Sequence, residues 1–596
     1  MIPFIGLGAG SALCLAGLLV TGVVGTPDTI RWIAITGLAC LAVLWGLVSL
    51  ARGRPFFLYP SMPAAALFLA WGWLSLAWSA DWRQGLVHAV NMTALGIVYL
   101  AVANVSRETL RVWVPKVAAV AVVGALGLQW YWPEAYGGFG NDNWQTEFLL
   151  LILPFLGALA CTVGAKRLVT VTAFAATCLF VGATIYLFLP GGSYVKWMVL
   201  FTVLSIGVVM AWRGGWKHLA AILGLCLANG VIWALVVEPG MIARKLTQRA
   251  ELATNTLAMW ADSPIIGQGL GSFNHEYGRF AEWHLGWFPN FDTMMRPMHM
   301  FAGQAHNDWA QMLAELGLIG FGLAAWFIWR TWRARSSWDG LDYAAGWSLL
   351  AAGVVGLVAF PLQNPWSALI VAIALGILSQ GPKGEFRLKW LARVPVMAAS
   401  ATIAGGLVFM AYGNFWSKAA FAWTRELIEK DPTQALAANF AAVKWWPFDG
   451  HARLQVAMSF ANLISRHRPC DVEPDQTKTC LNITRRAADQ INWIASGAAP
   501  YALSVKLGRI EYLLFSGHNE SDRQEIEDNL AWLRDHASLQ ATTWLTEAKW
   551  AGLNQDAPRM MEAIRRGYPM AKDPEAYYRP QFEQLAGTVT YEEIPQ

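Results

Sequence analysis

Charged residues are scarce in this sequence. Asp, Glu, Lys and Arg make up only 14% of the 596 residues, whereas 56% are hydrophobic. Soluble domains carry closer to a quarter charged residues, so the shortage excludes an ordinary soluble globular protein. The 33 tryptophans are typical of a chain with many membrane-spanning helices, because indole rings anchor such helices at the headgroup level. The net charge of +4 says little about partners, and we expect no nucleic acid among them.

The N-terminus lacks the features of a cleaved signal peptide. It has no charged n-region and no A-x-A cleavage site, so its apolar run is interpreted as a retained span. The sequence also lacks an H-E-x-x-H motif, which excludes the metal-binding helix of a zinc protease.

Apolar runs of about 17–25 residues are long enough to cross a hydrocarbon core about 30 Å thick. Thirteen such runs predict an all-α fold, a polytopic transmembrane helical bundle over residues 1–413 that spans a bilayer. The run at 366–380 is short and lies between Pro365 and Pro382. The thirteen runs lie near 3–24, 32–50, 61–78, 86–104, 112–131, 147–164, 168–189, 195–212, 216–237, 307–330, 342–360, 366–380 and 394–413.

Lys and Arg gather in every second loop between these runs. Cytoplasmic loops carry an excess of Lys and Arg, so the basic loops are predicted to be cytoplasmic. The alternation predicts a multi-pass protein of the bacterial inner membrane. Its N-terminus would be cytoplasmic, and everything after about residue 414 would be periplasmic. The basic loops contain Arg52 and Arg54; Arg107 and Arg111; Lys166 and Arg167; Arg213 and Lys217; Arg330, Arg333 and Arg335; and Lys383, Arg387, Lys389 and Arg393.

The segment 414–596 is charged and contains no spanning run. Its apolar residues recur at three- and four-residue spacing, which predicts short amphipathic helices and a periplasmic all-helical domain. Helix pairs of this length resemble tetratricopeptide-like (TPR-like) repeats, although no clean period is visible. Cys470 and Cys480 flank a polar loop and would pair as a disulfide outside the cytoplasm; two unpaired thiols are the alternative.

The long outer loop 238–306 carries the cations Arg244, Lys245 and Arg249 on a predicted helix. These residues break the positive-inside bias. A guanidinium fork can bind two phosphate oxygens at once, so Arg244 and Arg249 are candidate phosphate ligands; a solvated helix face beside lipid headgroups is the alternative. The outer loops hold no acidic pair or cluster of metal ligands, so we expect no metal and no other cofactor.

Two further features stand near the end of this loop. Gly267, Gly269 and Gly271 form a G-x-G-x-G run that allows sharp turns and close backbone approach, but no strand of a nucleotide-binding fold precedes it. His306 opens the next span and Glu315 lies within it. An intramembrane carboxylate is a candidate functional group, and a rim histidine could act as general base or be purely structural.

At these residues the sequence resembles the O-antigen ligase and O-antigen polymerase superfamily, membrane glycosyltransferases that include the bacterial O-oligosaccharyltransferases. The matching stretches occur in the family's order and together cover about residues 60–380. They are GNDNWQTEFLLLILPF at 140–155; Arg249 followed by WADSPIIGQGLGSF and Tyr277; AHNDWAQMLAELGLIG around His306, Asn307 and Glu315; and VAFPLQNPWSALIVAIALGIL at 358–378.

The resemblance implies a GT-C-like bundle whose donor is an undecaprenyl-pyrophosphate-linked glycan in the outer leaflet. Arg249, helped by Arg244, would stabilise the departing diphosphate, and His306 would orient or deprotonate the acceptor hydroxyl. Many members carry Ser-Arg at a middle span; here Tyr194 replaces that arginine, and Lys196 either supplies the charge or snorkels to the interface. The remaining substrate-binding candidates are Tyr277, Asn307, Glu315, Gly269 and Gly271.

The resemblance leaves the acceptor open. A surface-polysaccharide polymerase or an O-antigen ligase would use another lipid-linked glycan or the lipid A core of lipopolysaccharide. An O-oligosaccharyltransferase would use Ser or Thr of an exported protein, which a large outer helical domain could capture. A transporter is the alternative from another class, although no internal repeat of spans is visible.

Overall fold

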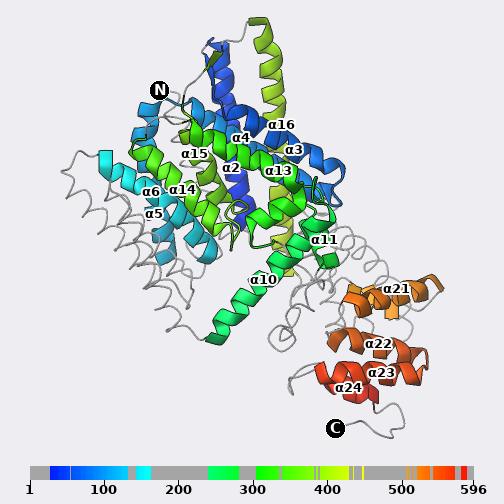
Figure 1. Ribbon diagram of the computed structural model, residues 1–596. Coiled ribbons are helices and arrows are strands. Elements are labelled where there is room, and N and C mark those ends of the chain that lie inside the picture. Colours follow the sequence, from blue (N-terminus) through cyan, green and yellow to red (C-terminus); the bar gives the residue numbers. More distant parts are fainter. Residues whose placement is uncertain are drawn as a thin grey trace.

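The chain is largely helical in a computed structural model (Figure 1). The structure describes residues 27–53, 55–131, 142–162, 239–280, 304–334, 338–381, 384–386, 390–427, 520–536, 541–570 and 579–586, with a few single positions between 434 and 514. The predicted spans near 3–24, 168–189, 195–212 and 216–237 lie outside these residues, as do Lys196, Cys470 and Cys480.

Within the described ranges, four helices are long and apolar enough to cross a membrane, fewer than the thirteen runs of the sequence. They are Arg31–Ala51 within α2 (Pro27–Ala51), α4 (Trp82–Asn104), α13 (Asp308–Arg333) and Arg393–Gly413 within α16 (Trp390–Leu427). Five shorter or less apolar helices coincide with other predicted runs. These are α3 (Met62–Leu74), α5 (Arg107–Tyr131), α6 (Asp142–Thr162), α14 (Gly340–Val355) and α15 (Pro365–Leu378).

Small residues let these helices approach closely. The main core lies between α2, α4, α5, α6, α14 and α15, and alanines such as Ala94 and Ala374 are fully buried in it. A Cβ on Gly376 of α15 would stand 2.8 Å from the Val102 side chain of α4. Such contacts are typical of helix pairs in membranes, where small interface residues bring the backbones together.

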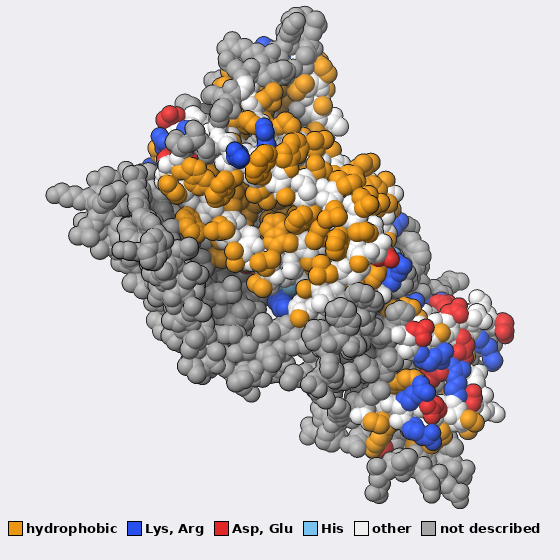
Figure 2. Space-filling view, in the orientation of Figure 1, with side chains coloured by type: hydrophobic (Ala, Val, Ile, Leu, Met, Phe, Trp, Pro, Cys, Tyr) orange, Lys and Arg blue, Asp and Glu red, His pale blue; other side chains and the backbone are white. Residues whose placement is uncertain are grey.

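The outer surface of the bundle is apolar. On the face shown in Figure 2, hydrophobic side chains cover most of the described part of the bundle, whereas acidic and basic side chains gather on the C-terminal helices. Large exposed apolar residues lie on helices from both the early and the late part of the chain. Among them are Leu44 on α2, Trp329 on α13, Val354 on α14 and Phe409 on α16. A soluble monomer rarely exposes so extensive an apolar surface, so the bundle is suited to a lipid environment.

One short ribbon interrupts the helical architecture that we predicted. Strand β1 (Phe56–Leu58) pairs antiparallel with β2 (Gly384–Phe386), and Phe57 N also donates a hydrogen bond to Asn104 Oδ1 at 2.8 Å. The ribbon joins two loops that the charge pattern assigns to the cytoplasmic side. Three-residue strands flanked by helices leave no periodic signal in the sequence, which explains why they were not predicted.

Four helices near the C-terminus pack together beyond α10 (Pro239–Asp262) and α11 (Phe273–Phe280) in Figure 1. Arg559 binds both Glu527 and Glu547, and these ion pairs hold the pKa of Arg559 above its usual range, although burial opposes them. Helix α16 continues past residue 413, the predicted boundary of the membrane domain, to Leu427. The four helices are α21 (Glu520–His536), α22 (Ala541–Leu553), α23 (Ala557–Gly567) and α24 (Arg579–Ala586).

Candidate functional site

Helix α13 is broken at Gly317, and the glycine-rich loop fills the break. Gly317 has φ 66° and ψ −171°, so the helical hydrogen bonds around it are not made. The loop replaces them: Gln268 N and Gly269 N donate to the carbonyls of Ala314 and Glu315, each at 2.8 Å. In the other direction, Leu318 N donates to Pro264 O at 2.9 Å. The loop therefore satisfies backbone groups that a break within an apolar helix would otherwise leave unpaired.

The three loop glycines lie in the left-handed region, where glycine has no steric penalty. A Cβ on Gly267 would stand 2.4 Å from the Glu315 carbonyl carbon, and one on Gly269 would stand 2.5 Å from Ser79 Cα. A Cβ on Gly271 would stand 2.3 Å from Gly85 N. The close approach predicted from the G-x-G-x-G run is thus an approach to the protein's own backbone in α13 and at the start of α4.

The segment between α3 and α4 holds the loop from the other side. Ser79 Oγ donates to Leu270 O at 2.8 Å, and Leu270 N donates to Ser75 Oγ at 3.1 Å. The indole of Trp71 donates to Leu316 O at 3.0 Å. These bonds fix α3, α4, α13 and the loop in one arrangement.

A row of polar side chains runs down the buried face of α13. Asp308, Gln311 and Glu315 stand three and four residues apart, so they share one face of the helix. Gln311 Nε2 donates to Glu315 Oε1 at 3.3 Å, as does Phe273 N. Gln363, from the loop between α14 and α15, donates to Gln311 Oε1 at 2.9 Å and to Asp308 Oδ1 at 3.3 Å. The two carboxylates are therefore held by amide and backbone donors.

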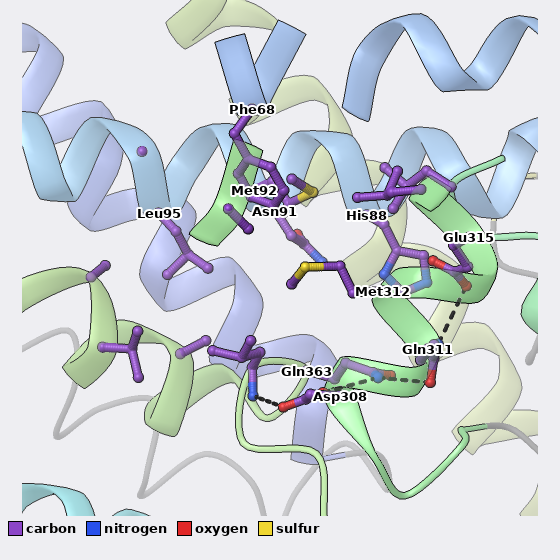
Figure 3. Close-up of a pocket in the computed structure, with 18 of the residues that line it drawn as sticks. Phe68, His88, Asn91, Met92, Leu95, Asp308, Gln311, Met312, Glu315 and Gln363 are labelled. Atoms are coloured by element: carbon purple, nitrogen blue, oxygen red, sulfur yellow. Dashed lines mark hydrogen bonds between the residues drawn. The ribbon is translucent and has the colours of Figure 1, made fainter. Parts of the chain in front are cut away.

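A second polar row, on α4, faces the same space. Gln84, His88 and Asn91 stand four and three residues apart, and Gln84 Nε2 lies 3.1 Å from His88 Nε2. Both rows line a cavity of about 620 Å³ between α3, α4, α13 and α15. Figure 3 shows His88, Gln311, Glu315 and Asp308 along this cavity.

The rest of the cavity is apolar. Its lining along α4 continues from Gln84 to Tyr99, about 22 Å at 1.5 Å per residue. Beyond the polar rows the lining includes Phe68, Leu95 and Phe327. At the far end Tyr99 OH lies 2.9 Å from Ser61 Oγ and 3.2 Å from Ser379 Oγ, a buried hydroxyl cluster between α3, α4 and α15. The cavity therefore has a polar end and a long apolar end.

The predicted phosphate ligand Arg249 is not among the residues that line this cavity. Among the described residues that line the cavity there is no Lys or Arg. Arg249 is half-buried on α10, close enough for its charge to act on Glu147 at the start of α6. Glu147 accepts a hydrogen bond from Asn364 Nδ2 at 3.3 Å and lies within electrostatic reach of Asp308. Arg249 thus belongs to the polar end of the bundle.

His306 is near the polar end but outside the cavity lining. It adopts a left-handed conformation with φ 50°, and its ring packs edge-on against Phe360 with centroids 4.7 Å apart. Asn307 is the N-cap of α13, where its side chain accepts a hydrogen bond from Ala310 N at 3.0 Å. Helix capping accounts for Asn307, which was predicted to bind substrate.

Tyr277 is also placed away from the cavity. It is fully buried on α11, where its hydroxyl accepts a hydrogen bond from Asn255 Nδ2 at 3.1 Å, and burial raises its pKa. Burial also raises the pKa of the neighbouring Glu251 to about 7. Tyr277 and Phe273 share a buried apolar cluster with Leu530 of α21 and Trp550 of α22.

The remaining predicted site residues divide into three groups. Gly271 and Glu315 line the cavity, whereas Gly269 packs against Ser79. Arg244 lies on α10, but its side chain lies outside what the structure describes, as does all of Lys196. Within the described part of the chain, no three His, Cys, Asp or Glu side chains gather as metal ligands would.

Sequence reasoning missed Gln84, His88, Asn91, Gln311 and Gln363 as site residues. The signal was present for the first four, because polar residues at three- and four-residue spacing on an apolar helix indicate an inward face. For Gln363, in a loop between helices, the sequence offers no such signal. No family model, no curated protein and no solved structure matches the chain.

Proposed function

We propose that this protein is a membrane glycosyltransferase that transfers an oligosaccharide from undecaprenyl diphosphate to an acceptor hydroxyl. It would act at the periplasmic face of the bacterial inner membrane. The observation that carries the proposal is the two-part cavity, because a lipid-linked glycan likewise has a hydroxylated head and a long apolar tail.

The polar end has the chemistry of a sugar site. Sugar hydroxyls both donate and accept hydrogen bonds, and the amides of Gln84, Asn91 and Gln311 offer donors and acceptors to match. The carboxylates Asp308 and Glu315 add strong acceptors. The apolar end would bury prenyl units, each of which loses water-exposed area on entering it.

The transfer would proceed by direct displacement. The acceptor oxygen bonds to the anomeric carbon while the bond from that carbon to the phosphate oxygen breaks. Undecaprenyl diphosphate leaves with the electron pair, and the acceptor proton passes to a protein base. Arg249, at the edge of the polar end, is suited to stabilise the growing diphosphate charge. The motif resemblance assigns the base to His306.

The acceptor is either a glycan, including the lipid A core, or a polypeptide. One observation favours the polypeptide, and with it an O-oligosaccharyltransferase. Phe273 lines the cavity and also packs in the apolar cluster that includes residues of the C-terminal helices. A polypeptide held by those helices would stand close to the polar end.

The test is transfer by the purified protein in liposomes, with an undecaprenyl-diphosphate oligosaccharide as donor and lipid-linked glycan or exported protein as acceptor. We expect product with the wild type and at least about a 100-fold loss with Arg249→Ala. Arg333→Ala, which removes an exposed arginine at the opposite end of α13, is the matched control and should retain activity. No product from the wild type with any of these acceptors would refute the proposal.

A further inference from the structure

A histidine other than His306 lies on the wall of the cavity. His88 lines the cavity from the second turn of α4, whereas His306 packs on Phe360 outside the lining. The Nε2 of His88 lies 3.1 Å from the Gln84 amide, one helical turn away. Because an amide nitrogen can only donate, Nε2 accepts this bond and is the ring nitrogen with a lone pair. An acceptor hydroxyl that takes the place of the Gln84 amide would donate its proton to this nitrogen.

The groups opposite His88 belong to α13. Figure 3 shows the His88 ring and the Glu315 carboxylate at the same end of the cavity. Glu315 and, farther along the helix, Asp308 are the titratable groups of α13 on the cavity wall; α11 and the glycine loop contribute the neutral Asn274 and Gly271. A carboxylate across the cavity favours the imidazolium ion that forms when His88 takes up a proton.

We propose that the space between His88 and Glu315 is the acceptor subsite, and that His88 accepts the proton of the attacking sugar or side-chain hydroxyl. This inference rests on the proposed glycosyl transfer and replaces His306 in the role of base. The hydroxyl oxygen forms its bond to the anomeric carbon, its proton moves to the imidazole, and the diphosphate departs with the bonding electrons. Glu315 accepts a second hydrogen bond from the acceptor and orients it.

His88 is a titratable residue within an apolar helix, a placement that costs free energy. A titratable side chain within an apolar helix is unfavourable unless it has polar partners, and such residues usually mark a functional path. Gln84 and Asn91 stand one turn to either side of His88 on the same face. The three residues form a polar strip on α4, and the packing of α4 against its apolar neighbours does not explain it.

The experiment compares His88→Gln, His88→Ala and His306→Gln in the liposome transfer assay. Glutamine keeps a hydrogen-bonding side chain but cannot accept the proton, so we expect His88→Gln to reduce kcat by at least about 100-fold with a nearly unchanged acceptor KM. Added imidazole should restore at least tenfold of the activity lost in His88→Ala, because it can occupy the space that the side chain leaves. His306→Gln should lose less than tenfold.

Each outcome of this experiment supports or overturns the role of His88 as the base. Full activity of His88→Gln, or failure of imidazole to restore His88→Ala while its thermal unfolding matches that of the wild type, overturns the role of His88. A 100-fold loss in His306→Gln alone returns the base to His306. If the wild type itself transfers no glycan, the proposed function fails first and this inference fails with it.

Discussion

The two ends of the helical bundle hold their carboxylates in different ways. At the end predicted to face the cytoplasm, Arg107 binds Asp339 at 2.6 Å and Asp342 at 2.7 Å, and Arg111 also binds Asp339 at 2.6 Å. At the cavity end, Asp308 and Glu315 are held by amides and backbone N–H groups. The first arrangement joins α5 to α14, whereas the second lines a cavity.

We interpret the carboxylates paired with arginine as serving stability and those held by amides as serving ligand binding. A carboxylate between two arginines is neutralised within the protein and has little left to offer a ligand. A carboxylate held by amides has no cation beside it, and a ligand hydroxyl can join or replace those donors at small cost. The backbone differs in the same way: α14 begins with a regular capping box, whereas α13 contains the Gly317 break beside a loop of left-handed glycines.

The largest loss of stability is expected where the backbone at the cavity end is most crowded. In Gly271→Ala the new Cβ meets the backbone of Gly85 and Gln84, and the residue has φ +80°. Backbone atoms cannot rotate away as a side chain can, so we expect a loss of more than about 4 kcal/mol of stability and little folded protein. Size-exclusion chromatography in detergent would measure the folded fraction.

The matched control for that change is Gly322→Ala on α13, where a Cβ has nothing within 4 Å. It should give as much folded protein as the wild type. Equal yields from Gly271→Ala and the wild type would show that the loop does not pack as described.

Replacing the Glu315 carboxylate with an amide tests the comparison between the two ends directly. Glu315→Gln keeps an oxygen that can accept from Phe273 N and Gln311 Nε2, so we expect the melting temperature to change little. Loss of the charge from the acceptor subsite should lower glycan transfer by about 10- to 100-fold, the value of a hydrogen bond to a charged group. Transfer kinetics and thermal unfolding, measured on the same preparation, test the expected effects on activity and on stability.

The control is Glu108→Gln, an exposed carboxylate on α5 near the ion-paired end. It should leave both activity and stability unchanged. A large fall in melting temperature with Glu315→Gln would mean that the charge serves the fold, and the contrast between the two ends would then disappear.

Much of the helical framework was predictable from the sequence, whereas the site was predictable only in part. Helix α13 begins within one residue of the predicted run at 307–330, because Asn307 caps it and apolar residues follow. The cavity depends on the apposition of α4 and α13, which are far apart in the sequence. Periodicity reveals the polar face of each helix but not that the two faces meet. The sequence therefore predicted His306, in its motif, as the base, whereas the cavity led us to propose His88.

The smallest effect is expected at the ion-paired end. Burial alone would raise the pKa of Asp339, but hydrogen bonds from Arg107 and Arg111 hold it below its usual range. A depressed carboxyl pKa stabilises the fold at every pH above the unfolded-state value of about 4, and the stabilisation is lost as the pH falls through the folded-state value. Asp339→Asn keeps a capping side chain for α14, so it removes the charge with little effect on the helix start.

We expect Asp339→Asn to cost about 1–2 kcal/mol at pH 7 and to leave glycan transfer unchanged, the reverse of Glu315→Gln. The gap in thermal stability between wild type and variant should narrow as the pH falls below about 4, because the Asp339 carboxyl of the unfolded wild-type chain then takes up a proton while the folded one is still ionised. A double-mutant cycle with Arg107→Gln isolates the pair: the two changes together should cost less than the sum of their separate costs. A simple sum would mean that Arg107 and Asp339 act independently and that this ion pair adds nothing to the stability of the fold.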